Sequence, residues 1–246
     1  EIIKVSIGQF YGIEINDFAV TVAKTSLWIA ESQMMKETEE IVNANLDFLP
    51  LKSYANIVEG NALRMDWESV VPKEKLDYIM GNPPFVGARM MEQGGEQKKD
   101  IQNIFGNIKD VQDLDYVTGW FKKAAQLIQN TKIECAFVST NSICQGSQVP
   151  ILWNVLLNEL NVKINFAYQT FKWESESTDK AAVHCVIVGF SNFNRNHKVI
   201  FKDSETKITV SNISPYLFEG ENTFVTAQKE VLCDVPKMNF GNQPRD

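Results

Sequence analysis

The stretch Asp77-Tyr78-Ile79-Met80-Gly81-Asn82-Pro83-Pro84-Phe85 joins a short apolar run to a stiff polar loop. The run is typical of a buried strand. The two prolines stiffen the loop after this strand, because each proline fixes its own φ and restricts the residue before it. Open α/β sheets bind their ligands at the carboxyl ends of strands, so the sequence predicts a binding loop over 82–85 at the edge of an α/β sheet.

The chain on either side of this loop alternates short apolar runs with longer helical patterns. Upstream, we predict a strand over 10–15, a helix over 17–35 capped by Asp17, and a strand over 56–58. Downstream, we predict a mobile polar excursion with a short helix over 86–111, a helix over 112–130, a strand over 135–139 and a helix over 148–160. This alternation is typical of βαβ units and a mostly parallel sheet.

The pattern changes beyond residue 160. Strands over 163–171 and 181–190 are separated only by the polar segment 174–180, which predicts an antiparallel hairpin at one edge of the sheet. Two more short strands are expected within 197–210, and residues 211–246 are weakly patterned.

Length and composition allow one large domain, since the 246 residues are 44% hydrophobic and 11% aromatic. The four cysteines are widely spaced and there are only two histidines, so we expect buried reduced thiols and no metal site. No apolar stretch approaches the roughly 20 residues that span a membrane, and no signal-peptide pattern opens the chain, so we expect a cytoplasmic protein. A net charge of −7 is unusual for a nucleic-acid-binding protein, which usually has a basic face.

The residue types of the loop over 82–85 suit one kind of ligand. An exocyclic amine on an aromatic base is a poor nucleophile, because its lone pair is delocalised into the ring. The side-chain oxygen of Asn82 and the main-chain carbonyl of Pro83 can accept its two N–H hydrogens and so favour the tetrahedral nitrogen of a transition state. Phe85 offers a flat face for stacking. An ordinary Asn-Pro turn is the structural alternative.

Two more polar motifs follow predicted strands. Glu14 ends the strand over 10–15, where a carboxylate can accept hydrogen bonds from both hydroxyls of a ribose; a surface glutamate that caps the next helix is the alternative. Asn61, within Gly60–Leu63, offers a donor and an acceptor to an adenine edge, and a plain Gly-Asn turn explains it equally well. The order of the motifs places all three at one edge of the sheet.

This order of motifs resembles that of the N6-adenine-specific DNA methyltransferases, and in particular of type II restriction-modification enzymes of the MmeI kind. In that family Gly-Ile-Glu-Ile, Gly-Asn-Ala-Leu, Asp-Trp and Asn-Pro-Pro-Phe recur much as they stand here at 12–15, 60–63, 66–67 and 82–85. The resemblance continues through 135–146, through 171–173 before the strand over 181–190, and through the tail 240–246.

The resemblance implies a Rossmann-like core that transfers a methyl group from S-adenosylmethionine to adenine extruded from double-stranded DNA. It implies that the cofactor is bound by Glu14, Ile15, Asn61, Ala62 and Asn82. It assigns the catalytic loop to Asn82, Pro83, Pro84 and Phe85, and it places the target base against Phe85 and an aromatic before the late hairpin, Phe171 or else Trp173. Two aromatics that simply pack on the hairpin are the alternative.

In this family a glycine-rich loop precedes the ribose-binding carboxylate by about 20 residues. Only 13 residues precede Glu14, and Gly8 is the single glycine among them. We therefore expect a fragment truncated at the first strand, with a methyltransferase core over 1–196 and a connector toward a target-recognition region over 197–246. Parts that grip DNA, and any fused nuclease, would lie outside it and account for its acidic balance; a basic face on this chain is the alternative.

Two other functions are compatible with the sequence. Asn-Pro-Pro-aromatic loops also occur in methyltransferases that act on RNA bases or on glutamine amides of proteins, although those enzymes usually lack the long insertion and the late hairpin. A degenerate scaffold that only binds DNA or a partner subunit is the second alternative, against which the intact Glu14 and Asn82–Phe85 argue.

Overall fold

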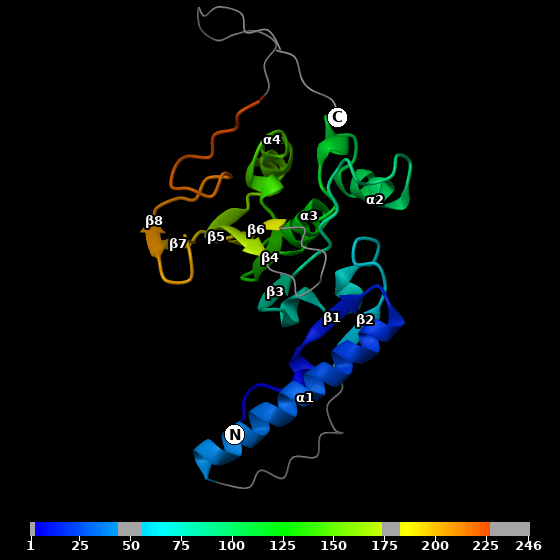
Figure 1. Cartoon of the computed structure of the whole chain (residues 1–246), viewed down its shortest axis with the longest axis vertical. Helices are drawn as coiled ribbons and strands as arrows, with labels where there is room; N and C mark the ends of the chain where they lie inside the picture. Colours follow the sequence, from blue (N-terminus) through cyan, green and yellow to red (C-terminus); the bar gives the residue numbers. More distant parts are fainter. Residues whose placement is uncertain (1–2, 44–55, 174–182, 227–246) are drawn as a thin grey trace, which may run out of the picture.

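The computed structural model describes residues 3–43, 56–173 and 183–226, which form two sheets flanked by helices (Figure 1). The strands are β1 (Tyr11–Glu14), β2 (Asn56–Glu59), β3 (Tyr78–Gly81), β4 (Glu134–Thr140), β5 (Lys163–Trp173), β6 (Val183–Ser191), β7 (Lys198–Phe201) and β8 (Lys207–Val210). The helices are α1 (Asp17–Val42), α2 (Glu96–Phe105), α3 (Thr118–Leu127) and α4 (Gln148–Trp153), the last continuing as a π-helical segment over Asn154–Glu159. The turn 174–180 and the tail 240–246 lie outside the described residues.

The predicted α/β class agrees with the structure, but the sheet is mixed. β1 and β2 form a parallel pair, and the larger sheet has the order β3-β4-β6-β5-β7-β8. Its pairs β3–β4 and β5–β7 are parallel, whereas β4–β6, β5–β6 and β7–β8 are antiparallel. The predicted antiparallel hairpin is confirmed as the β5–β6 pair. It lies inside the sheet and not at its edge, because β6 also pairs with β4 and β7 pairs with the outer side of β5, and the sheet is mixed where a mostly parallel one was predicted.

Helix α1 shows how local chemistry sets an element boundary. The side chain of Asn16 accepts hydrogen bonds from the backbone N–H groups of Phe18 and Ala19, at 2.9 and 3.2 Å. Asn16 is therefore the N-cap in place of the predicted Asp17, which is the first helical residue. The helix also runs past the predicted end at residue 35 to Val42, where Asn43 adopts a left-handed conformation with φ 50°.

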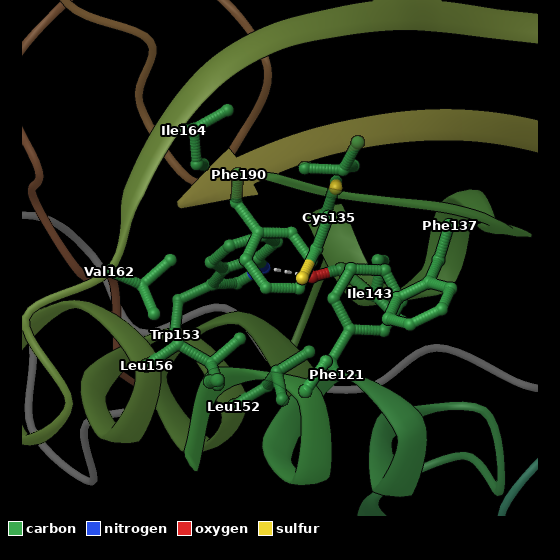
Figure 2. Close-up of a cluster of buried hydrophobic side chains, with 14 of the residues drawn as sticks. Phe121, Cys135, Phe137, Ile143, Leu152, Trp153, Leu156, Val162, Ile164 and Phe190 are labelled. Atoms are coloured by element: carbon green, nitrogen blue, oxygen red, sulfur yellow. Dashed lines mark hydrogen bonds between the residues drawn. The ribbon is translucent and has the colours of Figure 1, made fainter. Parts of the chain in front are cut away.

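The core lies between the six-stranded sheet and helices α3 and α4 (Figure 2). Phe121 of α3 stacks on Phe190 of β6 with ring centroids 5.6 Å apart. Trp153 is fully buried and donates its indole N–H to the carbonyl of Ile143 at 2.7 Å. Replacing such an enclosed aromatic side chain by alanine typically costs about 3–5 kcal/mol, so this cluster stabilises the sheet from which the loop Asn82–Phe85 leaves.

The cysteines agree with the expectation of buried thiols as far as they are described. Cys135, Cys144 and Cys185 are buried and free. Burial raises the pKa of all three thiols, so they stay protonated and behave as small apolar side chains. Among the described residues, no group of histidine, cysteine, aspartate and glutamate is arranged to hold a metal ion, and no helix is long and apolar enough to cross a membrane.

The segment over 86–111 is packed on the core, which contradicts the predicted mobile excursion. Met91, Ile101 and Phe105 are each at most 3% exposed. Ile101 and Phe105 lie on α2, which contacts α3. The short helix predicted in this segment is confirmed as α2, and most of its polar residues face solvent, whereas Asp100 is buried.

The sheet edges at β1 and β3 are open within the described residues. Within the described residues, β1 pairs only with β2, and β3 pairs only with β4. In the view of Figure 1, β1 lies between β2 and β3. Tyr78 and Met80 of β3 are 69% and 78% exposed, which is unusual for large apolar side chains of a sheet.

Candidate active site

The loop Asn82–Phe85 leaves the carboxyl end of β3, as predicted. Gly81, the last residue of β3, pairs with Phe137 in the middle of β4. Asn82 is exposed, Pro83 is buried and Phe85 is half-buried. Neither the Asn82 side chain nor the Pro83 carbonyl has a hydrogen-bond partner among residues 3–43, 56–173 and 183–226. Two acceptors from adjacent residues are therefore free to bind one amino group.

Glu14 lies at the carboxyl end of β1, beside the motif Gly60–Leu63 that follows β2. Glu14 is opposite Glu59 in the β1–β2 pair, and the N–H of Gly60 donates to the Glu14 carbonyl at 2.7 Å. The Glu14 side chain is exposed and has no hydrogen bond or ion pair within the part of the chain that the structure describes. Because Asn16 caps α1, the carboxylate of Glu14 is not needed as a helix cap.

An apolar surface adjoins this free carboxylate. Ile15, the residue after Glu14, is 69% exposed, and Phe18 in the first turn of α1 is 73% exposed. Ile15 was among the predicted cofactor residues, whereas Phe18 was not. The one feature of the sequence that could have indicated Phe18 is its position, because this aromatic residue lies outside the apolar stripe predicted for the helix.

The structure gives the side chain of Asn61 partners of its own. Its oxygen accepts from the backbone N–H of Leu63 at 2.9 Å, and its main-chain carbonyl accepts from the N–H groups of Arg64 and Met65. The side chain therefore shapes the turn after β2. The backbone N–H of Ala62 has no acceptor among the described residues, so it is a free donor of this turn.

Two side chains outside the motif hold this turn. Trp67 donates its indole N–H to the Ala62 carbonyl at 2.8 Å. Lys123 of α3 donates to the Leu63 carbonyl at 3.2 Å and to the Met65 carbonyl, and its ammonium lies 5.6 Å from the Trp67 ring centroid. Burial lowers the pKa of Lys123. Sequence reasoning missed Lys123, because about sixty residues separate it from the turn and no local pattern marks it.

Phe171 and Trp173 lie at the same end of the sheet as the loop Asn82–Phe85. Cys185 of β6 pairs with Thr140 on one side and with Phe171 on the other. Phe171 therefore lies level with the carboxyl end of β4, three strand spacings or roughly 14 Å across from β3. Its half-buried ring packs edge-on against Tyr168 at 5.3 Å, and Trp173 is 42% exposed.

Comparison with known proteins supports one family. Residues 1–202 match the family model described as the MmeI DNA-methyltransferase domain. The chain is 47% identical, over 98% of its length, to DNA methyltransferase A of Bacillus subtilis (strain 168). It also matches the structure of the Type IIL restriction-modification enzyme MmeI in complex with DNA, with a TM-score of 0.90 and 42% identity over 98% of this chain. The chain spans 28% and 33% of the lengths of these two relatives.

Proposed function

This chain belongs to the family of the MmeI DNA-methyltransferase domain, and from this membership and the geometry of the site we propose that it transfers a methyl group from S-adenosylmethionine to N6 of adenine in double-stranded DNA. The enzyme would act within a restriction-modification system. The catalytic loop is Asn82–Phe85, and the cofactor surface comprises Glu14, Ile15 and the turn at Asn61-Ala62, with Asn82 between cofactor and base.

The single observation that carries this proposal is the pair of free acceptors at Asn82 and Pro83. Each can take one N–H of an aromatic amine, which draws the nitrogen lone pair out of the ring as the new bond forms. Pro83 and Pro84 stiffen the loop, and Pro83 is buried. The two acceptors are therefore fixed in advance and need no reorganisation in the transition state. The surplus proton can leave to water after transfer, so positioning and electrostatics are sufficient.

The residues around Glu14 fit the proposed cofactor. An exposed carboxylate without a partner suits the two hydroxyls of a ribose, the neighbouring Ile15 and Phe18 suit the faces of an adenine, and the free N–H of Ala62 suits a ring nitrogen acceptor. When bound, S-adenosylmethionine supplies an electrophilic methyl group on a sulfonium. The donor and acceptor types of this surface therefore match the adenosine portion.

The glycine-rich strand and loop expected ahead of Glu14 stay a prediction. The open edges of β1 and β3 support it, because one further strand between them would join the two sheets and cover exposed apolar surface. In the proposed enzyme this segment would hold the methionine portion of the cofactor. Target-recognition and other DNA-gripping regions, proposed to lie in the rest of the protein, would supply the basic contacts that a net charge of −7 does not favour here.

The proposal is tested by nucleoside analysis. The full-length protein is incubated with methyl-labelled S-adenosylmethionine and duplex DNA, and the DNA is then digested and analysed by mass spectrometry. We expect the label in N6-methyldeoxyadenosine. Label only in an RNA or in a protein glutamine substrate would support the alternative enzymes, and binding of cofactor and DNA without any transfer would support a scaffold.

A further inference from the structure

Two adjacent buried residues, Asp115 and Tyr116, hold the exit of the catalytic loop. They are 6% and 5% exposed and lie just ahead of α3. The Asp115 carboxylate accepts from the backbone N–H of Ala88 at 2.7 Å, and the backbone N–H of Tyr116 donates to the Val86 carbonyl at 2.9 Å. The chain directly after Phe85 is thus held by one side-chain and one backbone hydrogen bond.

The same carboxylate also contacts residues at and just after the end of β4. Its second oxygen accepts from the hydroxyl of Ser142 at 2.5 Å. Asp115 has no cationic partner among the described residues. A buried charge is costly unless hydrogen bonds replace its hydration, and packing alone would be served by an apolar residue. The contacts of Asp115 therefore indicate a fixed geometry for the loop rather than a need for filled volume.

The side chain of Tyr116 reaches the other loop. Its hydroxyl donates to Asp100 of α2 at 2.9 Å, and Asp100 is only 4% exposed. Burial, followed by the hydrogen bond to Asp100, raises the pKa of Tyr116 to about 12, so the phenol stays protonated and donates at neutral pH. The same Asp100 carboxylate contacts the turn after β2.

Asp100 holds the turn after β2 through Asn61 and Arg64, the first and fourth residues of the turn. It accepts from Arg64 Nε at 2.7 Å and from a terminal Arg64 nitrogen at 3.2 Å, and the Asn61 amide lies 3.5 Å from the same carboxylate. The hydrogen bonds to Asp100 raise the pKa of Arg64. A continuous chain of contacts therefore runs from the catalytic loop, through Asp115-Tyr116, to the cofactor turn.

We propose that Asp115 and Tyr116 are positioning residues that set the catalytic loop against the cofactor turn. Such a link bears on catalysis because β2, which precedes the cofactor turn, and β3, which precedes the catalytic loop, are not hydrogen-bonded to each other, so side-chain contacts connect the two loops directly. Methyl transfer requires the amine and the methyl donor to be aligned, and a misplacement of about 1 Å can cost roughly 100-fold in rate. This inference rests on the proposed function of the two loops.

The two residues are expected to affect different constants. Tyr116→Phe removes the hydroxyl that orients Asp100 and keeps the ring. We therefore expect a roughly tenfold higher Kd for S-adenosylmethionine, whereas the single-turnover rate constant of transfer at saturating cofactor should change little. Asp115→Ala frees the loop after Phe85, so we expect roughly a 100-fold lower kcat with a nearly unchanged Kd. Asp115→Asn should recover most of the rate, because its amide oxygen still accepts from Ala88.

The measurements are titration calorimetry, single-turnover transfer and melting temperature, made on the full-length protein. Tyr216→Phe is the matched control, since it also loses one hydroxyl with one hydrogen bond, to the N–H of Val225 at 3.0 Å, outside the two loops. Equal changes of Kd and kcat that follow the melting temperature, or no rescue by Asp115→Asn, would overturn the inference. A wild-type protein without transfer would overturn the proposed function itself. An active wild type, with variants that change Kd and the transfer rate to the same extent, would remove only the positioning role.

Discussion

Asn82→Ala is expected to lower the rate of methyl transfer by about 100- to 1000-fold, the cost typical of removing one preorganised group that stabilises a transition state. The affinity for S-adenosylmethionine should stay within about twofold, because Asn82 acts on the target amine when the methyl group arrives. Single-turnover rates at saturating cofactor and titration calorimetry separate the two quantities. The exposed side chain of Asn82 makes no hydrogen bond or ion pair within the described residues, so its removal should leave the melting temperature nearly unchanged.

Glu14→Ala is the counterpart to this variant and should do the reverse. Loss of charge-assisted hydrogen bonds to a ribose costs about 1.5–3 kcal/mol, or roughly 10- to 100-fold in cofactor affinity. Transfer at saturating cofactor should then be largely preserved. If the two phenotypes were exchanged, the assignment of Glu14 to the cofactor and of Asn82 to the base would be wrong.

Phe85→Ala is expected to lower transfer to a paired adenine by about 10- to 100-fold, because stacking of a base on an aromatic ring contributes about 1–3 kcal/mol. The loss should be smaller for an adenine opposite a mismatch or a gap, since extrusion of that base costs less. Phe85→Tyr should retain much of the activity because the flat face remains. Phe218→Ala is a suitable control, as Phe218 is 53% exposed and is not among the aromatic residues proposed to contact the base.

A fluorescent 2-aminopurine at the target position reports the same event directly. Its emission rises on extrusion and falls when an aromatic ring stacks on it, so Phe85→Ala should give a brighter bound state than the wild type. An equal loss of activity on paired and mismatched DNA, with an unchanged fluorescence signal, would assign Phe85 to core packing and leave stacking to Phe171 or Trp173.

The sequence predicted those parts of the fold and site that depend on neighbouring residues. Strand periodicity and the stiff prolines were sufficient to place Asn82 after β3 and Glu14 at the end of β1, since both are adjacent to the patterns that mark them. The strand order was not predictable in the same way. The position of β6 between β4 and β5 depends on pairings such as Thr140 with Cys185, 45 residues apart, which leave no local pattern.

The link between the loops was missed for the same reason. Asp100 lies in the stretch over 86–111, whose polar residues suggested an excursion, and Asp115 and Tyr116 lie in the predicted helix over 112–130. The burial of all three becomes evident only when α2 packs on α3. Asn61 shows the opposite case. Its Gly-Asn context favoured a turn as strongly as a ligand contact, and the structure uses its side chain to build that turn.

The most direct test is a structure of the full-length protein bound to S-adenosylhomocysteine and to duplex DNA that contains its methylation site. We expect an adenine extruded from the duplex, with N6 about 2.7–3.2 Å from both the Asn82 side-chain oxygen and the Pro83 carbonyl, and with the ribose of the cofactor on Glu14. An adenine that stays stacked in the duplex while both ligands are bound, or another kind of amine held at Asn82, would contradict the proposed mechanism.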